Sequence, residues 1–501
     1  MLTRFLALFS LYYLIFASFS LVQPLCLDDE SFALLRFKGS FIIDQSASYD
    51  PSAYPKVSSW KLESDDCCSW DGVECDKDTG HVISLNLSSS CLYGSINSSS
   101  SLFRLVNLQR LNLSDNDFND SRIPSGVRQL SKLAHLDLSF SIFSGQIPLE
   151  ILQLSKLVYL DLSQNTLKLQ NPDLRSLVEK LTNMKKLFLS DVNISSALPN
   201  SFSNLTSLTS LFLTNCHLHG EFPTGIFRLP NLEDLRVRFN PDLTGYLPEF
   251  NRSSPLKLLK LTGTSFYGKL PDSIGNLKLL HDLEVTFCNF SGPLPPSLGN
   301  LTQLANLRLG KNGFHGSIPS SIYRLVNLEV LYLNSNYFGG TVQFDLFSKL
   351  QNLHEFQLSD NHISLLTKLS NNITFSKFWI LGLASCELNE FLDFLKNQNE
   401  LAFLELSNNK FHGLIPKWMW NLSKETLWFL DLSYNFLTGF DQLLVILPGT
   451  HLRFLDLSQN KLQGSLPIPP PSILTYSVLN NTLTGEIPLM ICNLAKFSYF
   501  P

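Results

Sequence analysis

A variant of the pattern LxxLxLxxN recurs seventeen times between His81 and the end of this 501-residue chain. Most successive copies lie 24 or 25 residues apart, so they form one phased series. A unit this short cannot bury its apolar side alone, and neighbouring units must cover it. The repeat therefore predicts a solenoid. The Asn position of successive copies is occupied by Ser90, Asn116, Ser141, Asn165, Val192, Cys216, Asn240, Thr264, Cys288, Asn312, Asn336, Asn361, Cys386, Asn409, Asn435, Asn460 and Asn481.

Each unit contains a step such as Leu160-Asp161-Leu162, in which apolar and polar residues alternate as in a half-buried strand. Both leucines are expected to point inward, and Asp161 to face a surface shared by all units. Parallel strands lie about 4.8 Å apart, so the strands predict a sheet on the order of 80 Å long. The predicted fold class is α/β: a right-handed leucine-rich repeat solenoid of about 17 units, with a concave parallel β-sheet and a disulfide-bonded N-terminal cap.

The Asn position follows the strand, where the chain turns and backbone groups lose their partners. A buried carboxamide both donates and accepts hydrogen bonds, so we expect it to satisfy these groups. Ten of the seventeen positions hold Asn. Three others hold Cys216, Cys288 and Cys386, which we expect to be buried thiols rather than redox or metal sites.

A second motif, G-x-[ILF]-P, follows the Asn position in nine copies. Gly allows a turn that a Cβ would obstruct, and Pro fixes φ where the outer, convex segment begins. With this insertion the repeat resembles the extracellular leucine-rich repeat consensus of plants. The nine motifs are Gly145–Pro148, Gly220–Pro223, Gly245–Pro248, Gly268–Pro271, Gly292–Pro295, Gly316–Pro319, Gly413–Pro416, Gly464–Pro467 and Gly485–Pro488.

Residues 1–23 are typical of a secretory signal peptide, with Arg4 as the positive start and an apolar run from Phe5 to Phe19. A signal anchor is the alternative, although the run is barely long enough for one. No other stretch offers the run of about 20 apolar residues that a membrane helix needs. The net charge of −5 and the 16% of charged residues argue against nucleic acid or an anionic membrane as the partner.

Four of the nine cysteines, Cys26, Cys67, Cys68 and Cys75, precede the first repeat. An exported chain meets an oxidising compartment, so they predict two disulfides. Three pairings are open, of which the local pair Cys68–Cys75 with Cys26–Cys67 is the most natural. Zinc is the alternative, but adjacent cysteines lack the usual ligand spacing. We therefore expect no metal site in the cap.

The predicted organisation is a cap at 24–80, a solenoid block at 81–341, irregular repeats at 342–399 and a solenoid block at 400–501 that ends in an incomplete repeat. The segment from Gln170 to Leu181 is expected to lengthen a convex helix. Residues 342–399 lack the G-x-[ILF]-P motif, which predicts irregular repeats with a bulging loop near 367–377. A hinge between two blocks is the alternative reading of this region.

The last repeat ends without a C-terminal cap, which leaves an open apolar edge. Cys91 and Cys492 have no evident partners, and an unpaired thiol in a secreted chain suggests that its partner lies elsewhere. We therefore expect the chain to be part of a longer protein.

Ligand binding is expected on the concave sheet, where outward residues of successive units are neighbours. Aromatic and Arg side chains are typical interface anchors, and the middle units are rich in them. Acidic residues flank this centre, at Asp137 and Asp161 before it and at Glu405, Asp431 and Asp456 after it. A basic, aromatic centre of this kind predicts an acidic or aromatic-bearing protein or peptide ligand. The candidate binding residues are Phe188, Phe212, Arg236, Arg238, Phe239, Lys260, Glu284, Phe287, Arg308, Lys311 and Tyr332.

Twelve N-x-[ST] sequons predict N-linked glycans, which would keep partners off the surfaces they cover. Asn86 and Asn112 face outward from the first two strands, so glycans there would block the N-terminal concave face. Short sequons also arise by chance in such repeats, and some are expected to stay bare. The sequons begin at Asn86, Asn97, Asn112, Asn119, Asn193, Asn204, Asn251, Asn289, Asn300, Asn372, Asn421 and Asn480.

No motif for catalysis occurs in the sequence, neither GxxxxGK[ST] nor HExxH nor the kinase set. The aspartates at the strand positions belong to separate repeats, so they do not predict a convergent acid and base pair. We predict that the chain is not an enzyme and needs no cofactor.

Four stretches make the chain resemble plant receptor-like proteins, the membrane-anchored leucine-rich repeat receptors without a kinase that include pathogen-resistance receptors. The resemblance covers roughly 26–501. It implies extracellular recognition of a protein or peptide elicitor in defence, with receptor kinases as signalling partners. These receptors carry a membrane helix that this chain lacks, so it implies the plasma membrane for a longer parent and the apoplast for a complete chain. The stretches are CCSWDGVEC, the LDLSxN repeats with GxIP, IPKWMWNLSKETL and LQGSLPIPPPSILTYSVLNNTLTGEIP.

The alternative function is a secreted inhibitor or decoy, similar to plant polygalacturonase-inhibiting proteins, that blocks a microbial enzyme on the concave face. The absence of a membrane helix from the sequence favours this alternative. The length and the irregular zone at 342–399 favour a receptor.

Overall fold

The computed structural model describes residues 25–61, 66–251, 254–367, 373–441, 447 and 451–492, so the predicted signal peptide at 1–23 lies outside the described residues. The chain divides into two compact units: unit 1 ends at Ser195 and unit 2 begins at Ser196. The repeat ladder did not predict this division. None of the helices in the described ranges is long and apolar enough to cross a membrane.

The cap of unit 1 pairs with both strands of the first repeat. It begins with helix α2 (Asp28–Lys38). Strand β1 (Phe41–Ile43) pairs antiparallel with β4 (Leu92–Gly94), and β2 (Val73–Cys75) pairs antiparallel with β3 (Val82–Asn86). The cap thereby covers the start of the repeat sheet, which would otherwise be an open edge.

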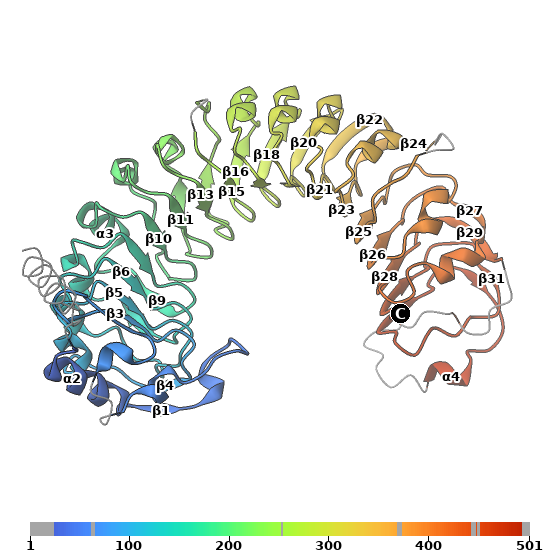
Figure 1. Cartoon of the computed structure of the whole chain (residues 1–501). Helices are drawn as coiled ribbons and strands as arrows, with labels where there is room; N and C mark the ends of the chain where they lie inside the picture. Colours follow the sequence, from blue (N-terminus) through green and yellow to red (C-terminus); the bar gives the residue numbers. More distant parts are fainter. Residues whose placement is uncertain are drawn as a thin grey trace, which may run out of the picture. The chain divides into compact units, whose positions relative to one another are not determined.

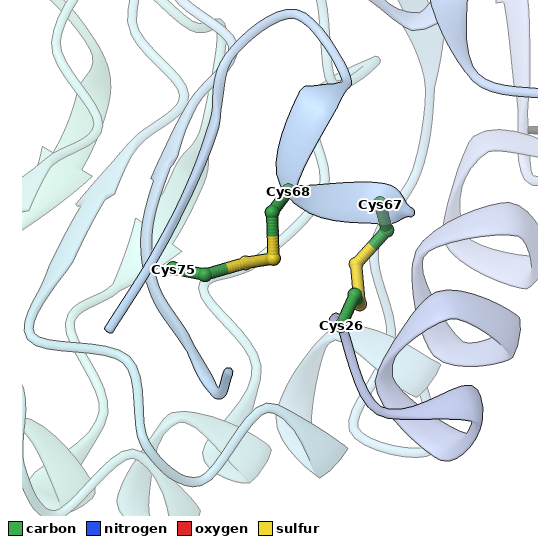
Figure 2. Close-up of side chains that lie close together, drawn as sticks. All are labelled: Cys26, Cys67, Cys68 and Cys75. Carbon is green, nitrogen blue, oxygen red and sulfur yellow. A yellow bond between two sulfur atoms is a disulfide. The ribbon is translucent and has the colours of Figure 1, made fainter. Parts of the chain in front are cut away.

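The predicted disulfides both form in the cap (Figure 2). Cys26 bonds to Cys67 and Cys68 bonds to Cys75, with Cα–Cα distances of 5.4 and 5.5 Å. One carboxylate oxygen of Asp66 accepts hydrogen bonds from the backbone N–H groups of Cys26 and Cys68, both at 3.0 Å. All four sulfur atoms are used in these bonds, so none of them is a thiolate that could bind zinc. Cys91 is a buried free thiol, and the side chain of Cys492 lies outside the described residues.

Unit 1 continues as a parallel sheet with one strand per repeat. The central leucines stand in register, for example Leu85 beside Leu111, and both are buried. On the convex side, α3 (Leu174–Lys180) lies within the segment predicted to lengthen a helix, and the Asp173 side chain caps it by accepting from Ser176 N–H at 2.8 Å. After β3 the parallel strands are β5 (Arg110–Asn112), β6 (His135–Asp137), β8 (Tyr159–Asp161) and β10 (Lys186–Phe188).

Unit 2 has the same plan over more repeats. In its described part, twelve short strands pair in parallel and in chain order, and helical turns lie on the opposite, outer side (Figure 1). The predicted inward direction of the leucines is confirmed, since the middle residue of each strand is buried. The strands are β11 (Ser210–Phe212), β13 (Asp234–Arg236), β15 (Leu258–Lys260), β17 (Asp282–Glu284), β19 (Asn306–Arg308), β21 (Val330–Tyr332), β23 (Glu355–Gln357), β25 (Ile380–Gly382), β26 (Phe403–Glu405), β28 (Phe429–Asp431), β30 (Phe454–Asp456) and β32 (Thr475–Ser477).

The convex sides carry mostly 3-10 turns instead of α-helices. In six repeats the proline of G-x-[ILF]-P directly precedes such a turn, as predicted. A last helix, α4 (Leu489–Cys492), ends the described chain. The turns are Gln45–Ala47, Lys56–Ser59, Cys67–Ser69, Ser101–Arg104, Ser125–Gln129 and Leu149–Gln153 in unit 1, and Asn200–Asn204, Thr224–Arg228, Asp272–Asn276, Pro296–Asn300, Ser320–Arg324, Phe344–Lys349, Asp393–Asn397 and Lys417–Asn421 in unit 2.

A second set of strands runs beside the main sheets, and the sequence pattern did not predict it. Eight of the nine motif glycines lie at or near these strands with φ between 76° and 91°, as the predicted turn requires. Gly245 is the exception: its φ is not positive, and a Cβ there would lie 2.9 Å from the Phe266 ring. The strands are β7 (Ser144–Gln146), β9 (Thr166–Lys168), β12 (Gly220–Glu221), β14 (Leu243–Gly245), β16 (Ser265–Gly268), β18 (Asn289–Gly292), β20 (Gly313–Gly316), β22 (Tyr337–Gln343), β24 (His362–Leu366), β27 (His412–Ile415), β29 (Phe436–Phe440), β31 (Gln463–Gly464) and β33 (Thr482–Leu483).

The buried Asn ladder joins each repeat to the one before it. The Asn240 side-chain oxygen accepts from Cys216 N–H and Leu218 N–H, both at 3.0 Å. Its amide group donates to the carbonyls of Leu213, Val237 and Arg238 at 2.8 to 3.1 Å. The predicted double role of the carboxamide is therefore confirmed.

The thiols predicted at three ladder positions are also buried. Cys288 donates to the carbonyl of Leu261 at 3.3 Å, so it replaces part of the Asn function. Burial raises the pKa of the Cys386 thiol well above its usual range, and the charges of Asp360 and Glu405 add to this. Burial also raises the pKa of the Cys288 thiol. Cys288 and Cys386 therefore resist ionisation and are structural groups.

The irregular zone at 342–399 does not interrupt the sheet. Strands β21, β23, β25 and β26 pair in unbroken order across it. The sheet is therefore continuous where a hinge was the alternative interpretation, and part of the predicted loop, at 368–372, lies outside the described residues. Aromatic rings take the place of the lost motif: Phe344 packs against Phe375 and Phe394 with ring centroids 4.9 and 5.4 Å away.

Candidate functional site

The structure distributes the eleven predicted binding residues over two units. Phe188 ends β10 in unit 1, where its ring meets Tyr159 edge-on at a centroid distance of 5.5 Å. The other ten belong to unit 2 and form two groups. The strand group, on the strands or within two residues of their ends, is Phe212, Arg236, Arg238, Lys260, Glu284, Arg308 and Tyr332. The loop group, on the turns that follow, is Phe239, Phe287 and Lys311.

Arg236 of the strand group is held from two sides. Its guanidinium makes two hydrogen bonds to the Asp234 carboxylate, at 2.9 and 2.7 Å, and lies 4.2 Å from the centre of the Phe212 ring. The bond to Asp234 raises the pKa of Arg236 above its usual value. Arg236 is therefore fixed in place as a flat, charged surface over an aromatic ring.

Lys260 and Arg238 converge on Glu284. The Lys260 ammonium lies 2.6 Å from Asp282 and 3.4 Å from Glu284, and Arg238 lies 3.5 Å from Glu284. The Thr262 hydroxyl also donates to Glu284 at 2.9 Å. Burial disfavours the charged form of Glu284, but the Thr262 bond and the two cations outweigh it and lower its pKa. This carboxylate is therefore ionised and internally paired.

Arg308 and Tyr332 share a third acid, Glu355 on β23. The guanidinium lies 3.4 Å from the Glu355 carboxylate and 5.2 Å from the centre of the Tyr332 ring. The Tyr332 hydroxyl donates to Glu355 at 2.5 Å. Burial, with this hydrogen bond, raises the pKa of Tyr332 well above its usual range. The hydroxyl therefore stays protonated and keeps the acid in place.

The sequence predicted a basic centre on the concave sheet, called the central face below. This prediction is wrong, because all four cations of the strand group have acidic partners. The partners overlooked in the sequence are Asp234, Asp282 and Glu355, which occupy the first position of their strands. The acid lies on the same strand as its cation for Arg236, on the next strand for Lys260 and two strands further for Arg308. The missed signal was an acid at the first position of a strand, within two strands of each of these three cations.

The loop group, in contrast, surrounds an open cavity of about 570 Å³. Phe239 and Phe287 line it with 51% and 64% of their surfaces exposed. The ammonium of Lys311 lies 5.8 Å from the centre of the Phe287 ring. Two exposed phenyl rings and an amine without an ion pair among the described residues make this the part of the predicted site that is free to bind.

Gly263 creates the space between the two rings. One residue per repeat follows the strand with a positive φ, and in three successive repeats these residues are Phe239, Gly263 and Phe287, with φ of 55°, 71° and 57°. A Cβ on Gly263 would lie 3.0 Å from the Phe239 ring. The left-handed backbone disfavours bulky residues such as Phe. The signal for this cavity is present in the sequence as F, G and F at one position of three successive repeats.

Two acidic residues on the strands of unit 1 are largely shielded from solvent. Asp161 and Asp137 stand in register on β8 and β6. Burial, together with the charge of Asp137, raises the pKa of Asp161 to about 6. The Asp161 carboxylate accepts from Ser163 N–H at 2.9 Å, and Asn112 accepts from Ser114 N–H at the same distance. An Asn side chain can therefore replace Asp161 and keep this hydrogen bond.

Replacing Asp161 with Asn is expected to stabilise unit 1 near pH 7 by about 1–3 kcal/mol. The folded pKa of about 6 exceeds the ordinary value of 3.8, so the folded state binds the proton more tightly. The destabilisation by Asp161 is therefore fully present above the folded pKa and disappears as the pH falls to the ordinary value. Chemical unfolding at several pH values should show that the advantage of the variant shrinks through this window. A gain independent of pH, or one matched by Asp120→Asn at an exposed site, would contradict this.

The structure leaves eleven of the twelve sequon asparagines accessible and places none of them in the core. Asn112 and Asn193 are half-buried, and the other nine described ones are exposed. Asn372 lies outside the described residues. Asn289 lines the cavity of the loop group, so a glycan there would compete with a ligand.

Comparison with family models identifies leucine-rich repeats along most of the chain. A model described as a leucine-rich repeat region matches residues 244–470. The leucine rich repeat N-terminal domain matches residues 27–76, and the single leucine rich repeat matches 107–130 and 207–229.

Comparison with curated proteins finds receptor-like proteins of Arabidopsis thaliana. Receptor-like protein 6 is 35% identical over an alignment that covers 95% of this chain and 59% of that protein. Receptor-like protein 7 is 40% identical, with 95% and 58% covered. The chain thus spans less than two thirds of the length of these relatives.

Comparison with solved structures finds plant receptor ectodomains. The peptide hormone receptor RGFR1 in complex with RGF2 has a TM-score of 0.65 and 26% identity, over 86% of this chain and 79% of that chain. The ectodomain of the Arabidopsis receptor kinase HAESA with an IDA peptide hormone has a TM-score of 0.63 and 25% identity, over 95% and 89%. The solenoid seen here is therefore a known architecture for ligand-binding ectodomains.

Proposed function

Because the chain belongs to the plant leucine-rich repeat receptor-like proteins, we propose that it recognises an extracellular protein or peptide elicitor in plant defence. The cavity between Phe239 and Phe287 is the observation that carries this proposal. Exposed phenyl rings are costly to leave in water, and they anchor ligands in interface pockets. An aromatic or aliphatic ligand side chain would fill the space over Gly263, and an acidic group would pair with Lys311.

The strand group supplies a fixed surface beside the cavity. Its ion pairs hold Arg236 and Arg308 over the Phe212 and Tyr332 rings, so little conformational entropy is lost when a ligand covers them. A ligand that entered the cavity would extend across β13 to β19. This arrangement favours contacts through ring and guanidinium faces over the general attraction of an acidic ligand.

The proposed place of action is the cell surface, with receptor kinases as signalling partners. One of the similar ectodomains, that of HAESA, was solved in complex with the peptide hormone IDA and the co-receptor SERK1, with a TM-score of 0.59 and 25% identity. This partnership belongs to HAESA and supports the proposal for this chain by analogy of fold and family.

The double variant Phe239→Ser and Phe287→Ser tests the proposal. Ser335 and Ser385 occupy the same repeat position with φ of 53° and 57°, so serine fits the backbone there. The immobilised chain would be exposed to apoplastic fluid from infected leaves, captured proteins identified by mass spectrometry, and each purified for affinity measurement. A ligand of this site should bind the double variant about tenfold or more weakly.

Phe140→Ser is the matched control, because Phe140 holds the same repeat position in unit 1 with a φ of 52° and an exposed ring. The control should leave affinity unchanged. If the ligand binds the double variant as tightly as it binds the original chain and the control, the assignment of this cavity is disproved.

A further inference from the structure

A stack of phenylalanine rings lies on the last strands of unit 2, away from the site described above. Phe403, Phe429 and Phe454 occupy the first positions of β26, β28 and β30 and stand in register. Their ring centroids are 4.1 and 4.3 Å apart, with interplanar angles of 10° and 6°. All three rings are half-buried, so the phenyl stack keeps part of its surface open on the strand face.

The phenyl stack ends at Thr475 of β32, and a cavity of about 620 Å³ opens where the next ring would be. Trp428, Phe454 and Leu474 form its apolar walls, and Arg453 also lines it. Trp428 is 42% exposed and meets both Phe403 and Phe429 edge-on, at 6.2 and 5.7 Å. An exposed Trp beside an apolar cavity is the usual composition of an interface anchor site.

A row of carboxylates runs beside the phenyl stack. Glu405, Asp431 and Asp456 follow the three phenylalanines by two residues on the same strands and stand in register. Within the described part of the chain, no Lys, Arg or His forms an ion pair with any of them. Burial raises the pKa values of Glu405 and Asp431. This carboxylate row therefore differs from the central face, where the acids are paired with cations.

We propose that the phenyl stack and the carboxylate row bind an extended basic segment of a partner protein, which places an apolar side chain in the cavity beside Trp428. Cations are attracted both to carboxylates and to aromatic rings. The row spans about 10 Å over three strands, and alternate side chains of an extended segment lie about 7 Å apart. Two Arg or Lys residues separated by one residue would therefore fit along it.

The charge decides between the candidate occupants of this surface. A neutral apolar segment would cover the three carboxylates without compensating them, and burying unpaired charges is costly. A basic segment supplies the missing partners. This surface lies on β26 to β32, whereas the proposed elicitor cavity lies on the turns after β13 to β19, so the two can be tested separately.

The test measures fluorescence polarisation of a labelled synthetic peptide of about ten residues, with Arg and Thr alternating around one Trp. The whole chain is titrated against this peptide and against one with Glu in place of Arg. We expect saturable binding of the Arg peptide only. Glu405→Gln with Asp431→Asn and Asp456→Asn should weaken it by about tenfold or more.

This triple variant should fold, because Asn86 and Asn112 hold the same strand position and accept from Ser88 and Ser114 N–H. Asp431 accepts in the same way from Ser433 N–H. Asp137→Asn with Asp161→Asn in unit 1 is the matched control and should leave binding unchanged. Phe429→Thr removes one ring, and Thr475 shows that Thr fits this strand position; its binding should fall by a similar factor.

Several results would overturn the proposal. They are no saturable binding of the Arg peptide, equal binding of the Glu peptide, or an unchanged affinity of the triple variant. Self-association of the chain in sedimentation experiments that Phe429→Thr abolishes would assign the surface to a second copy of the chain, and would overturn it as well.

Discussion

Phe314→Ala is expected to lower the free energy of unfolding by about 3–5 kcal/mol, the range for a fully buried phenyl ring. Phe314 is completely buried and stacks between Phe290 and Phe338, with ring centroids 6.1 and 6.2 Å away. Its neighbours cannot move to fill the space. The Asn312 side chain accepts from Phe290 N–H at 3.0 Å, and Asn361 accepts from Phe338 N–H at 3.1 Å, so both flanking backbones are held.

Equilibrium unfolding in guanidinium chloride measures this effect, and hydrogen exchange of the amides on β18 to β22 locates it. Phe287→Ala is the control, because that ring is mostly exposed and should cost little. A loss below about 1 kcal/mol for Phe314→Ala would show that the repeats repack freely around the missing ring.

Asn240→Ala should destabilise unit 2 by about 3 kcal/mol, since it leaves buried backbone groups without partners. The side chain makes five hydrogen bonds, which involve Cys216, Leu218, Leu213, Val237 and Arg238. Asn240 is completely buried, so water does not replace these bonds.

Asn240→Cys is the informative companion to Asn240→Ala. Natural repeats place Cys288 at the same position, where its thiol donates to a carbonyl one repeat earlier. We therefore expect Asn240→Cys to keep part of the stability lost in Asn240→Ala, as judged by unfolding midpoints. Asn408→Ala, at an exposed neighbouring position of another repeat, should cost much less, because that side chain makes a single exposed hydrogen bond, to Ser385. Equal midpoints for all three variants would contradict the role given to the ladder.

The parts of the fold that could be predicted are those that one repeat encodes for itself. Leu160 and Leu162 point inward because a strand has a period of two, and Asn240 bonds to its neighbours because a turn leaves backbone groups open. The local pair Cys68–Cys75 follows from closeness in sequence. Each of these features depends on residues within one or two repeats.

The features that could not be predicted depend on comparing the same position in several repeats. The pairing of Lys260 with Asp282 needs the register between β15 and β17, and the cavity needs Gly263 to stand between Phe239 and Phe287. Both features are visible in the sequence only when equivalent positions of successive repeats are compared. The division at Ser195 has no signal in the ladder, which continues through it.

The direction of the Asn ladder has a consequence for synthesis on the ribosome. Asn116 satisfies Ser90 N–H and Leu92 N–H of the preceding repeat, so each repeat is completed only by the one that emerges after it. At typical translation rates one repeat takes about 1–5 s to appear. During that interval the last repeat of the nascent chain has backbone N–H groups without hydrogen-bond partners. Each new repeat satisfies these groups and exposes its own, until translation ends.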